Sequence, residues 1–426
     1  MNILFVSQSA LDKKKSFGNT ICNWFEGKEW KDVGFSHFYV RKQKPDNNMN
    51  VNYYNLPATE IVRGIFKLNI KGLTFNSGNC KVLDERKEAF ENEKNQIDKL
   101  HDGKNHNIIY FFHELVWMSK LWINKSLKNF INKNSPDIIF TFATSPYIIW
   151  PLIKYLRKHT NCKVVLFIAD NVYESYDDFV WYRKLYLKKY FAKCIKYADK
   201  LYAVSNEMAQ LYEKLFKKDV SVLYKGCDLS VAPKNSNNFP LHMVYAGNLL
   251  WGRDETLAKI VKALKIINSD SLKIVLDIYT GTAISDTLKS KLNVKGISRV
   301  LSAKPYEEIK KIINSADISL HVESFDMEQI KLVKQSFSTK IIDCLQSGTQ
   351  VIGIGPKKIA SVEYLRKIDG VLVIDELNDI TQKLTELIKD TDKIMINKKK
   401  IFECAKKKHD INIVQKELKK ELYNLL

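Results

Sequence analysis

The sequence lacks any long uninterrupted hydrophobic run. Its most apolar stretch, residues 138–153, contains two threonines, a serine and two prolines, so it is too broken to cross a membrane as a helix. Near the start of the chain, apolar residues 3–6 come first and lysines 13–15 follow, which reverses the order of a signal peptide. We therefore expect a cytoplasmic protein without a membrane span.

Cysteine and histidine occur without the spacing of a disulfide framework or a metal site. The seven cysteines are scattered and form no C-x-x-C pair, which suits free thiols in a reducing compartment. The eight histidines include no H-E-x-x-H pattern. The sequence therefore predicts neither a metal centre nor another bound cofactor.

Three common catalytic motifs are also missing. The chain has no Walker A sequence, no G-x-G-x-x-G after an expected strand and no G-x-S-x-G turn. These motifs hold nucleotide phosphates, bind dinucleotides and expose a nucleophilic serine, respectively. Their absence disfavours P-loop nucleotide hydrolysis, the common dinucleotide redox folds and the serine hydrolases.

Positive charge, in contrast, is present in excess. The 426 residues include 68 Lys and Arg against 48 Asp and Glu, for a formal net charge of +20 at pH 7. Such a charge attracts nucleic acid, anionic lipid and phosphorylated substrates. The alternative is a compositional bias, because lysine, asparagine and isoleucine are abundant throughout. A hydrophobic share of 45% indicates a globular protein.

Short apolar runs alternate with amphipathic segments, which predicts two doubly wound parallel α/β sheets. The polar segment 232–240, bracketed by prolines, is the expected linker. It separates an N-terminal domain over 1–231 from a C-terminal domain over 241–426, and the last helix is a candidate to pack back on the first domain. Strands are expected at 3–6, 138–142, 164–168 and 201–204, and at 243–246, 274–279, 318–321 and 351–354.

Residues 335–348 predict a loop that leads into a helix between two strands. Small hydroxyl residues open the helix and Gly348 ends it. The loop would bring backbone N–H groups and Lys340 to the carboxyl edge of the sheet, where they suit a phosphate, and Asp343 could accept ribose hydroxyls. The alternative is an ordinary capped helix. The candidate ligand-binding residues here are Gln335, Ser336, Phe337, Ser338, Thr339, Lys340 and Asp343.

In the first half, candidate residues follow two expected strands. Gly18 ends the long loop after the first strand, where a glycine permits a close approach of the backbone to a ligand, and a flexible surface loop is the alternative. Asp170 and Glu174 follow the strand at 164–168 and are candidates to bind a substrate or transfer a proton. Helix capping by Asp170 is the alternative there.

In the second half, three further loops follow expected strands. The glycine-flanked loop at 245–253 offers Arg253, whose forked guanidinium suits the oxygens of a diphosphate. A solvated arginine is the alternative. A base could lie against the backbone at the end of the next strand, with an aromatic side chain stacked on it. The candidate residues of these loops are Gly247, Asn248, Arg253, Thr280, Gly281 and Tyr306.

Two stretches of the first half mix basic and aromatic residues, at 63–75 and 108–133. The second is expected to contain one long helix over 108–131. Such segments can lie on an anionic membrane surface, and packing in the core is the alternative. A peripheral contact with the inner face of the cytoplasmic membrane is therefore one expectation.

Four segments together resemble the retaining glycosyltransferase family four, whose members have the GT-B fold of two facing Rossmann-like domains. They are ADKLYAVS at 198–205, VLYKGCD at 222–228, YAGNLLWGR at 245–253 and SFSTKIIDCLQSG at 336–348. The resemblance is strongest over residues 135–360. It implies that the first domain binds the acceptor and that the second binds the nucleotide-sugar donor.

The chain departs from the pattern of this family at three places. Gln335 and Asp343 occupy the positions of two glutamates that the family separates by seven residues. Arg253 is followed by an acidic residue where the family has lysine, so Lys340 is expected to supply the second positive charge. Lys225 replaces the usual asparagine.

The resemblance implies a transferase that moves a sugar from a nucleoside diphosphate sugar to a saccharide or lipid-linked acceptor. The product would be a bacterial surface polysaccharide, such as a capsule, or a lipopolysaccharide, made with retention of configuration. Arg253, Lys340 and N–H groups near 336–338 would stabilise the departing diphosphate. A phosphate oxygen would take the proton of the acceptor, while Asp170 or Glu174 orients that acceptor.

Two alternatives stay open at the level of sequence. A nucleotide-sugar epimerase or hydrolase could share the fold, and it would turn over the donor without an acceptor. A basic protein that binds nucleic acid or a membrane without chemistry would show salt-sensitive binding instead. For the preferred interpretation, neither nucleic acid nor a metal ion is an expected partner.

Overall fold

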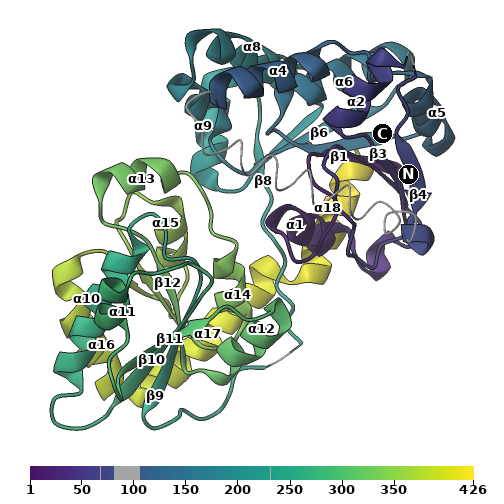
Figure 1. Cartoon of the computed structure of the whole chain (residues 1–426). Coiled ribbons are helices and arrows are strands. Elements are labelled where there is room, and N and C mark those ends of the chain that lie inside the picture. The colour runs from purple at the N-terminus through teal and green to yellow at the C-terminus, as the bar shows by residue number, and fades with distance from the viewer. Residues whose placement is uncertain (68, 81–105, 231) are drawn as a thin grey trace. The chain divides into compact units, whose positions relative to one another are not determined.

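The protein is described by a computed structural model (Figure 1). The described residues are 1–67, 69–80, 106–230 and 232–426. The chain divides into two compact units. The first consists of Met1–Leu223 with Gln415–Leu426, and the second consists of Tyr224–Val414. The chain therefore passes from one unit to the other twice.

The described residues of the first unit form a sheet in the order β4-β3-β2-β1-β5-β6-β7-β8. All neighbouring strands run parallel except the antiparallel pair β3 and β4. The strands are β1 (Asn2–Ser7), β2 (Gly34–Tyr39), β3 (Val51–Asn55), β4 (Leu73–Asn76), β5 (Ile138–Phe142), β6 (Lys163–Ile168), β7 (Lys200–Ala203) and β8 (Ser221–Val222).

Helices cover both faces of this sheet, which explains why its strands are apolar on both sides (Figure 1). In β1, Phe5 faces α1, and its ring lies 5.0 Å from that of Phe25. Leu4 and Val6 alternate to the opposite face and join the core beneath α4, α5, α6 and α8. The helices are α1 (Ser16–Phe25), α2 (Ala58–Phe66), α4 (His106–Met118), α5 (Lys125–Asn134), α6 (Pro146–His159), α7 (Val172–Ser175), α8 (Trp181–Tyr197), α9 (Asn206–Phe216) and the later part of α18 (Ile411–Tyr423).

The last helix completes the first unit from far along the chain. Gln415 on α18 donates hydrogen bonds from Nε2 to the carbonyls of Asn23 and Glu26, at 2.8 and 2.9 Å. Further along the helix, Leu418 and Leu422 are buried. The end of α18 is thus a structural part of the first unit.

The prediction of a single helix over 108–131 is wrong, because a turn separates α4 from α5. Lys120 adopts a positive φ of 61° in this turn, a conformation that interrupts a helix. The indole Nε1 of Trp122 donates to the carbonyl of Trp117 at 2.6 Å, and Asn124 then caps α5. Since Trp122 is itself buried, the apolar pattern continues across the turn and conceals the break.

The second unit contains a parallel sheet in the order β11-β10-β9-β12-β13-β14. This order reverses between β9 and β12, and doubly wound sheets bind ligands outside the carboxyl ends of the strands at such a reversal. The strands are β9 (Leu241–Ala246), β10 (Ile274–Thr280), β11 (Ser298–Ser302), β12 (Ile318–Val322), β13 (Gln350–Ile354) and β14 (Leu372–Ile374). The parallel, doubly wound architecture expected from the sequence is confirmed.

Helices flank the second sheet as well. They are α10 (Arg253–Ile267), α11 (Asp286–Leu292), α12 (Tyr306–Ser315), α13 (Met327–Val333), α14 (Lys340–Gln346), α15 (Ala360–Arg366), α16 (Ile380–Lys389), α17 (Thr391–His409) and the start of α18. Among the described helices of either unit, none is long and apolar enough to cross a bilayer.

The segment 232–240, expected as the linker, lies within the second unit. The backbone N–H of Asn238 donates to Asp317 at 3.1 Å, and the side-chain oxygen of Asn237 accepts a hydrogen bond from Lys398 at 2.7 Å. Asp317 and Lys398 form a buried ion pair, with 3.5 Å between nitrogen and oxygen. The polar residues that suggested a linker are therefore hydrogen-bond partners of this buried ion pair.

Candidate functional site

Residues of three loops meet at the carboxyl ends of β9 and β12 in the second unit. Arg253 begins α10, Glu323 directly follows β12, and Lys340 begins α14. Parallel strands end at one edge of a sheet, so these side chains come together although they are far apart in the sequence. The structure thus joins Arg253 and Lys340, which the sequence predicted, and adds Glu323, which the sequence reasoning missed.

Arg253 is buried and is held by a carboxylate. Its Nε and one terminal nitrogen donate to Oε2 of Glu323 at 3.0 and 2.8 Å, and the other terminal nitrogen donates to Oδ1 of Asn248 at 2.7 Å. The centroid of the Trp251 ring lies 5.1 Å from Cζ. Charge-assisted bonds from several nitrogens fix the orientation of the guanidinium, so Arg253 is not a solvated surface residue.

Glu323 is buried and carries a negatively charged carboxylate. Its Oε1 lies 3.3 Å from Nε2 of His321. Burial alone would raise the pKa of Glu323, but His321 and the Arg253 guanidinium outweigh burial and hold this pKa below its ordinary value. The signal that could have found Glu323 is its place directly after an expected strand, where the same reasoning singled out Asp170.

Lys340 reaches the loop after β9. Its Nζ lies so close to Gly247 that a Cβ on residue 247 would overlap it. The hydroxyl of Tyr245 lies beside the same position and donates to the carbonyl of Asn248 at 2.6 Å. Burial, together with the charge of Arg253, lowers the pKa of Lys340 to about 8. The side chain of Lys340 therefore crosses the loop at residue 247, and a larger residue there would require the flexible end of this lysine to move.

The segment before α14 is more bonded internally than the sequence indicated. The backbone N–H of Ser336 donates to the carbonyl of Val333 at 3.0 Å. The backbone N–H of Ser338 donates to Oγ of Ser361, also at 3.0 Å. The expectation of free backbone N–H groups is therefore wrong at these two residues, because nearby carbonyl and hydroxyl oxygens already accept their hydrogen bonds.

Other residues of this segment take up different positions. Gln335 lies in the turn after α13. Phe337 is buried, and its ring lies 5.0 Å from the rings of Tyr224 and Tyr364. Thr339 precedes α14, but its side chain makes no capping hydrogen bond. Phe337 thus anchors the segment in an aromatic cluster, next to the lysine that begins the helix.

Asp343 and Tyr306, the predicted contacts of a ribose and a base, lie together. The Tyr306 hydroxyl donates to Oδ1 of Asp343 at 2.9 Å, and Nε2 of Gln346 lies 3.4 Å from the same oxygen. Burial raises the pKa of Asp343, although the nearby charge of Lys225 opposes this shift. Burial also lowers the pKa of Lys225. A second polar cluster therefore lies one helical turn beyond Lys340.

The end of β10 is tied to the loop after β9. Oγ1 of Thr282 accepts from the backbone N–H of Leu249 at 3.0 Å, and Oγ1 of Thr280 accepts from that of Thr282 at 3.1 Å. A Cβ on Gly281 would meet Ala303 at an ordinary 3.5 Å, so packing does not require this glycine. Thr280 and Gly281 therefore stand beside the loop that leads to α10.

The three candidate residues of the first unit lie near the carboxyl edge of its own sheet. Gly18 stands in the first turn of α1, where a Cβ would overlap the backbone of Asp12, so this glycine serves the packing of the loop. Asn171, and not Asp170, caps α7, because its side chain accepts from the backbone N–H of Glu174. Its Nδ2 also donates to the carboxylate of Glu174.

The cluster in the second unit offers more cations than anions. Arg253 and Lys340 accompany one buried carboxylate, that of Glu323. In the part of the chain that the structure describes, no three His, Cys, Asp or Glu side chains are arranged to hold a metal ion. A phosphate-bearing ligand would complement the remaining positive charge.

Comparison with known proteins identifies the fold. Residues 83–231, a little over a third of the chain, match the family model described as Glycosyltransferase Family 4. No curated protein sequence matches the chain significantly. Solved structures match nearly its whole length. Sucrose-phosphate synthase from Thermosynechococcus elongatus has a TM-score of 0.64 at 12% identity, covering 100% of this chain and 98% of that one.

Two other structures have similar scores. Anabaena Alr3699/HepE in complex with UDP has a TM-score of 0.61 at 13% identity, with 100% of both chains covered. An α,α-trehalose-phosphate synthase (UDP-forming) from Burkholderia xenovorans has a TM-score of 0.60 at 8% identity, with 99% of both chains covered. At these identities the likeness shows the fold, and the GT-B fold expected from the sequence is confirmed. With the family match over 83–231, the chain is a glycosyltransferase of the GT-B type.

Proposed function

We propose that this glycosyltransferase takes its sugar from a nucleoside diphosphate sugar bound in the second unit. The observation that carries the proposal is the cluster of Arg253, Glu323 and Lys340 at the reversal point of the sheet. A guanidinium and an ammonium are well suited to bind the negatively charged oxygens of a diphosphate. Doubly wound sheets bind nucleotides at such a reversal point.

Departure of the diphosphate is the step that this cluster would assist. As the bond between sugar and phosphate breaks, negative charge grows on the departing oxygen, and fixed positive charge stabilises it. Arg253, oriented by Glu323, and Lys340 would supply that charge. The departing oxygen would itself accept the proton of the acceptor hydroxyl. The new bond would then form on the same face of the sugar, with retention of configuration.

The nucleoside is proposed to lie along the second polar cluster. Asp343 would accept hydrogen bonds from the ribose hydroxyls, and Tyr306 would lie against the base, beside Thr280 and Gly281. Because Oδ1 of Asp343 already accepts from Tyr306, the ribose would use the other carboxylate oxygen. The Anabaena structure was solved in complex with UDP, so uridine diphosphate sugars are the first donors to test.

The acceptor is proposed to bind in the first unit, with Asp170 and Glu174 orienting its hydroxyl. A lipid-linked saccharide at the cytoplasmic face of the membrane is proposed as this acceptor, because the formal net charge of +20 would attract the protein to an anionic membrane surface. The product class would be a bacterial surface polysaccharide or a lipopolysaccharide. This assignment would make the enzyme a cytoplasmic protein with a peripheral membrane contact.

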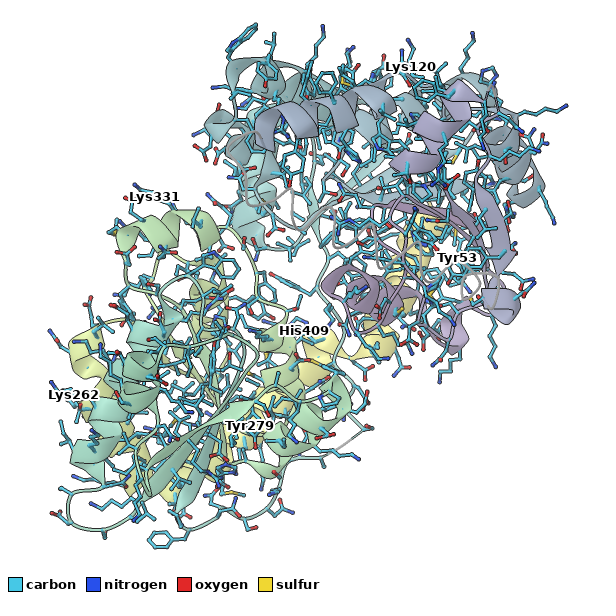
Figure 2. All side chains as sticks on the ribbon, viewed as in Figure 1. Tyr53, Lys120, Lys262, Tyr279, Lys331 and His409 are labelled. Atoms are coloured by element: carbon cyan, nitrogen blue, oxygen red, sulfur yellow. The ribbon has the colours of Figure 1, made fainter. Side chains whose placement is uncertain are left out.

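Binding of nucleoside diphosphates tests the donor site. The Tm of the full chain is measured with UDP, GDP and ADP, and the matching diphosphate should raise it, because ligand at a hundred times its Kd adds about 2.7 kcal/mol to the stability. Lys340→Ala should abolish this shift. Lys262→Ala is a matched control, since Lys262 is exposed on α10 (Figure 2). An unchanged Tm with all three diphosphates would refute the proposed donor site.

Turnover separates a transferase from an epimerase or a hydrolase. The matching nucleotide sugar is incubated with the protein, with and without a lipid extract that contains saccharide acceptors. Release of the diphosphate should depend on the extract, because the departing oxygen needs the proton of an acceptor. Equally fast release in its absence would indicate hydrolysis and would contradict the transfer reaction.

A further inference from the structure

Three helices on one face of the first sheet expose large apolar side chains to solvent. α2, α4 and α8 pack over the same core, and Figure 1 shows them on the side of the sheet away from α1. α2 contacts α4, and α4 contacts α8 through the rings of Phe111 and Tyr182, whose centroids are 5.1 Å apart. Their outward sides therefore form one surface, which we call the outer surface.

The outer surface carries apolar residues that the core does not need. Each of the three helices already buries a separate apolar side, at Ile61, Trp117 and Leu187, for example. The exposed set comprises Phe66 (85% exposed), Trp181 (78%), Leu185 (68%) and Phe112 (62%), together with Val62, Ile65, Tyr110 and Leu115. Soluble monomers rarely expose so many large apolar side chains on neighbouring elements, which indicates a binding surface.

Basic residues accompany this apolar set. α8 contains no acidic residue, and its basic residues are Arg183, Lys184, Lys188, Lys189, Lys193 and Lys196. Three of them pair with carboxylates of the same unit. Within the described residues, five lysines of the three helices and their ends have no carboxylate at ion-pair distance, namely Lys67, Lys120, Lys189, Lys193 and Lys196. Figure 2 shows Lys120 at the edge of the first unit, beside α4.

We propose that the outer surface docks on an anionic lipid bilayer. The phenyl and aliphatic side chains enter the region beneath the headgroups, and the indole of Trp181 lies at the headgroup level. The unpaired lysines contact the lipid phosphates. This inference deepens the proposed function, on which it rests for the lipid-linked acceptor, because it names the surface that brings the enzyme to that acceptor.

A second copy of the chain is a poorer occupant of the same surface. In a two-fold contact each outer surface would meet itself. The unpaired lysines at α8 would then stand among like charges, which opposes association. An anionic bilayer complements the apolar residues and the positive charge together.

The structure changes which residues serve this contact. Trp117, Trp122 and Phe130, all within the stretch at 108–133, are buried in the core. Phe112 is strongly exposed on α4, and α8 adds Trp181 and Leu185, which the sequence reasoning did not consider. The contact is therefore distributed over three helices and is not confined to the two stretches rich in basic and aromatic residues.

Flotation of the full chain with lipid vesicles tests the surface. One set of vesicles is phosphatidylcholine, and the other contains phosphatidylglycerol as well, each at low and high salt. The wild type should float with the anionic vesicles at low salt. The variant Phe66→Ser/Phe112→Ser/Trp181→Ser should lose about tenfold in partitioning, because it lacks the inserted side chains. Circular dichroism and Tm should be unchanged, since the three residues are exposed.

A matched control places the same changes on the second unit. Ile266→Ser/Leu272→Ser/Leu332→Ser alters three exposed apolar residues and should float like the wild type. A further variant, Lys189→Glu/Lys196→Glu, should float less with anionic vesicles at low salt and should behave like the wild type with phosphatidylcholine. Reduced flotation of this charge variant with anionic vesicles at low salt would support an electrostatic contribution to docking.

Three outcomes would overturn the proposal. They are absence of wild-type flotation with anionic vesicles at low salt, equal loss in the control triple variant, and a wild-type dimer in light scattering that the Phe66 triple variant dissolves without any lipid binding. The Tm shift with UDP is measured separately on the same variants. Failure of the donor site therefore cannot be mistaken for failure of the outer surface.

Discussion

Glu323 holds two nitrogens of Arg253, and both residues are buried. Glu323→Ala should lower the free energy of unfolding by about 3–5 kcal/mol, because it leaves a buried charge without its partner. Glu323→Gln keeps the shape and should cost less, but turnover should fall as the guanidinium loses its ionic anchor. Urea unfolding and donor turnover measure the two effects. Glu328→Ala, on an exposed residue of α13, is the control, and wild-type stability in Glu323→Ala would contradict the prediction.

We expect donor binding to depend on pH through Lys340, because burial lowers the pKa of this residue to about 8. The ammonium form binds the diphosphate, and above pH 8 the free protein has lost that proton. Affinity should therefore be level below pH 8 and fall above it, by at most about tenfold per pH unit. Calorimetric titration with UDP measures this profile. Lys340→Arg should bind with a level profile over the same range, and a level profile in the wild type would contradict the assignment.

The lowered pKa of Lys340 affects the stability of the fold in the direction opposite to its effect on donor binding. In the unfolded chain a lysine has its ordinary pKa of about 10.4, so between pH 8 and that value the unfolded state binds more protons at this residue. The contribution of Lys340 to folding stability therefore rises with pH above 8, while donor binding weakens. Below pH 8 the site therefore holds a charged lysine whose burial destabilises the fold.

Sequence reasoning found some residues of the donor site and missed others for a physical reason. Arg253 could be predicted because it ends the loop after an expected strand, and Lys340 because it stands at the start of an expected helix. Glu323 was missed because its role depends on an arginine 70 residues away in the chain. The amides of Ser336 and Ser338 were taken as free, since a sequence does not show which distant hydroxyl accepts their hydrogen bonds.

Among the elements, the turn between α4 and α5 depends on the indole of Trp122. Trp122→Phe keeps a ring in the core but removes the donor to the carbonyl of Trp117. The free energy of unfolding should fall by about 1–3 kcal/mol, the range for a buried polar group left unpaired. Urea unfolding measures this loss, and Leu121→Ala, on an exposed neighbour in the same turn, should change stability little. Equal stability of the two variants would remove the indole from this role.

Strands and helices differ in how far the sequence predicts them. Most strands of both sheets could be found because helices bury both of their faces, which makes strands such as β6 almost wholly apolar, but the antiparallel edge strand β4 was not expected. The break after α4 could not, because a turn closed by a buried tryptophan has the apolar pattern of a helix. The position of the segment 232–240 within the second unit could not be predicted either. Its asparagines form hydrogen bonds with Asp317 and Lys398, which are distant in the sequence.

At the scale of the whole molecule, the end of the chain supports its beginning. Leu422 on α18 is fully buried in the first unit, so Leu422→Ala should cost about 2–5 kcal/mol of unfolding free energy. Tryptophan fluorescence in urea reports on this unit, because every tryptophan except Trp251 lies in it. Leu426→Ala, on an exposed residue, is the control. A wild-type unfolding curve for Leu422→Ala would show that α18 is dispensable.

The position of α18 also governs the order of events during synthesis. About 190 residues of the second unit lie between the two parts of the first. At about 5–20 residues per second, a ribosome needs about 10–40 s to make them. During that interval the side chains of the first unit that will pack against Leu418 and Leu422 stay uncovered and can contact chaperones and other nascent chains. Slower translation of residues 224–414 should therefore increase aggregation of the newly made protein, although no residue of the finished enzyme has changed.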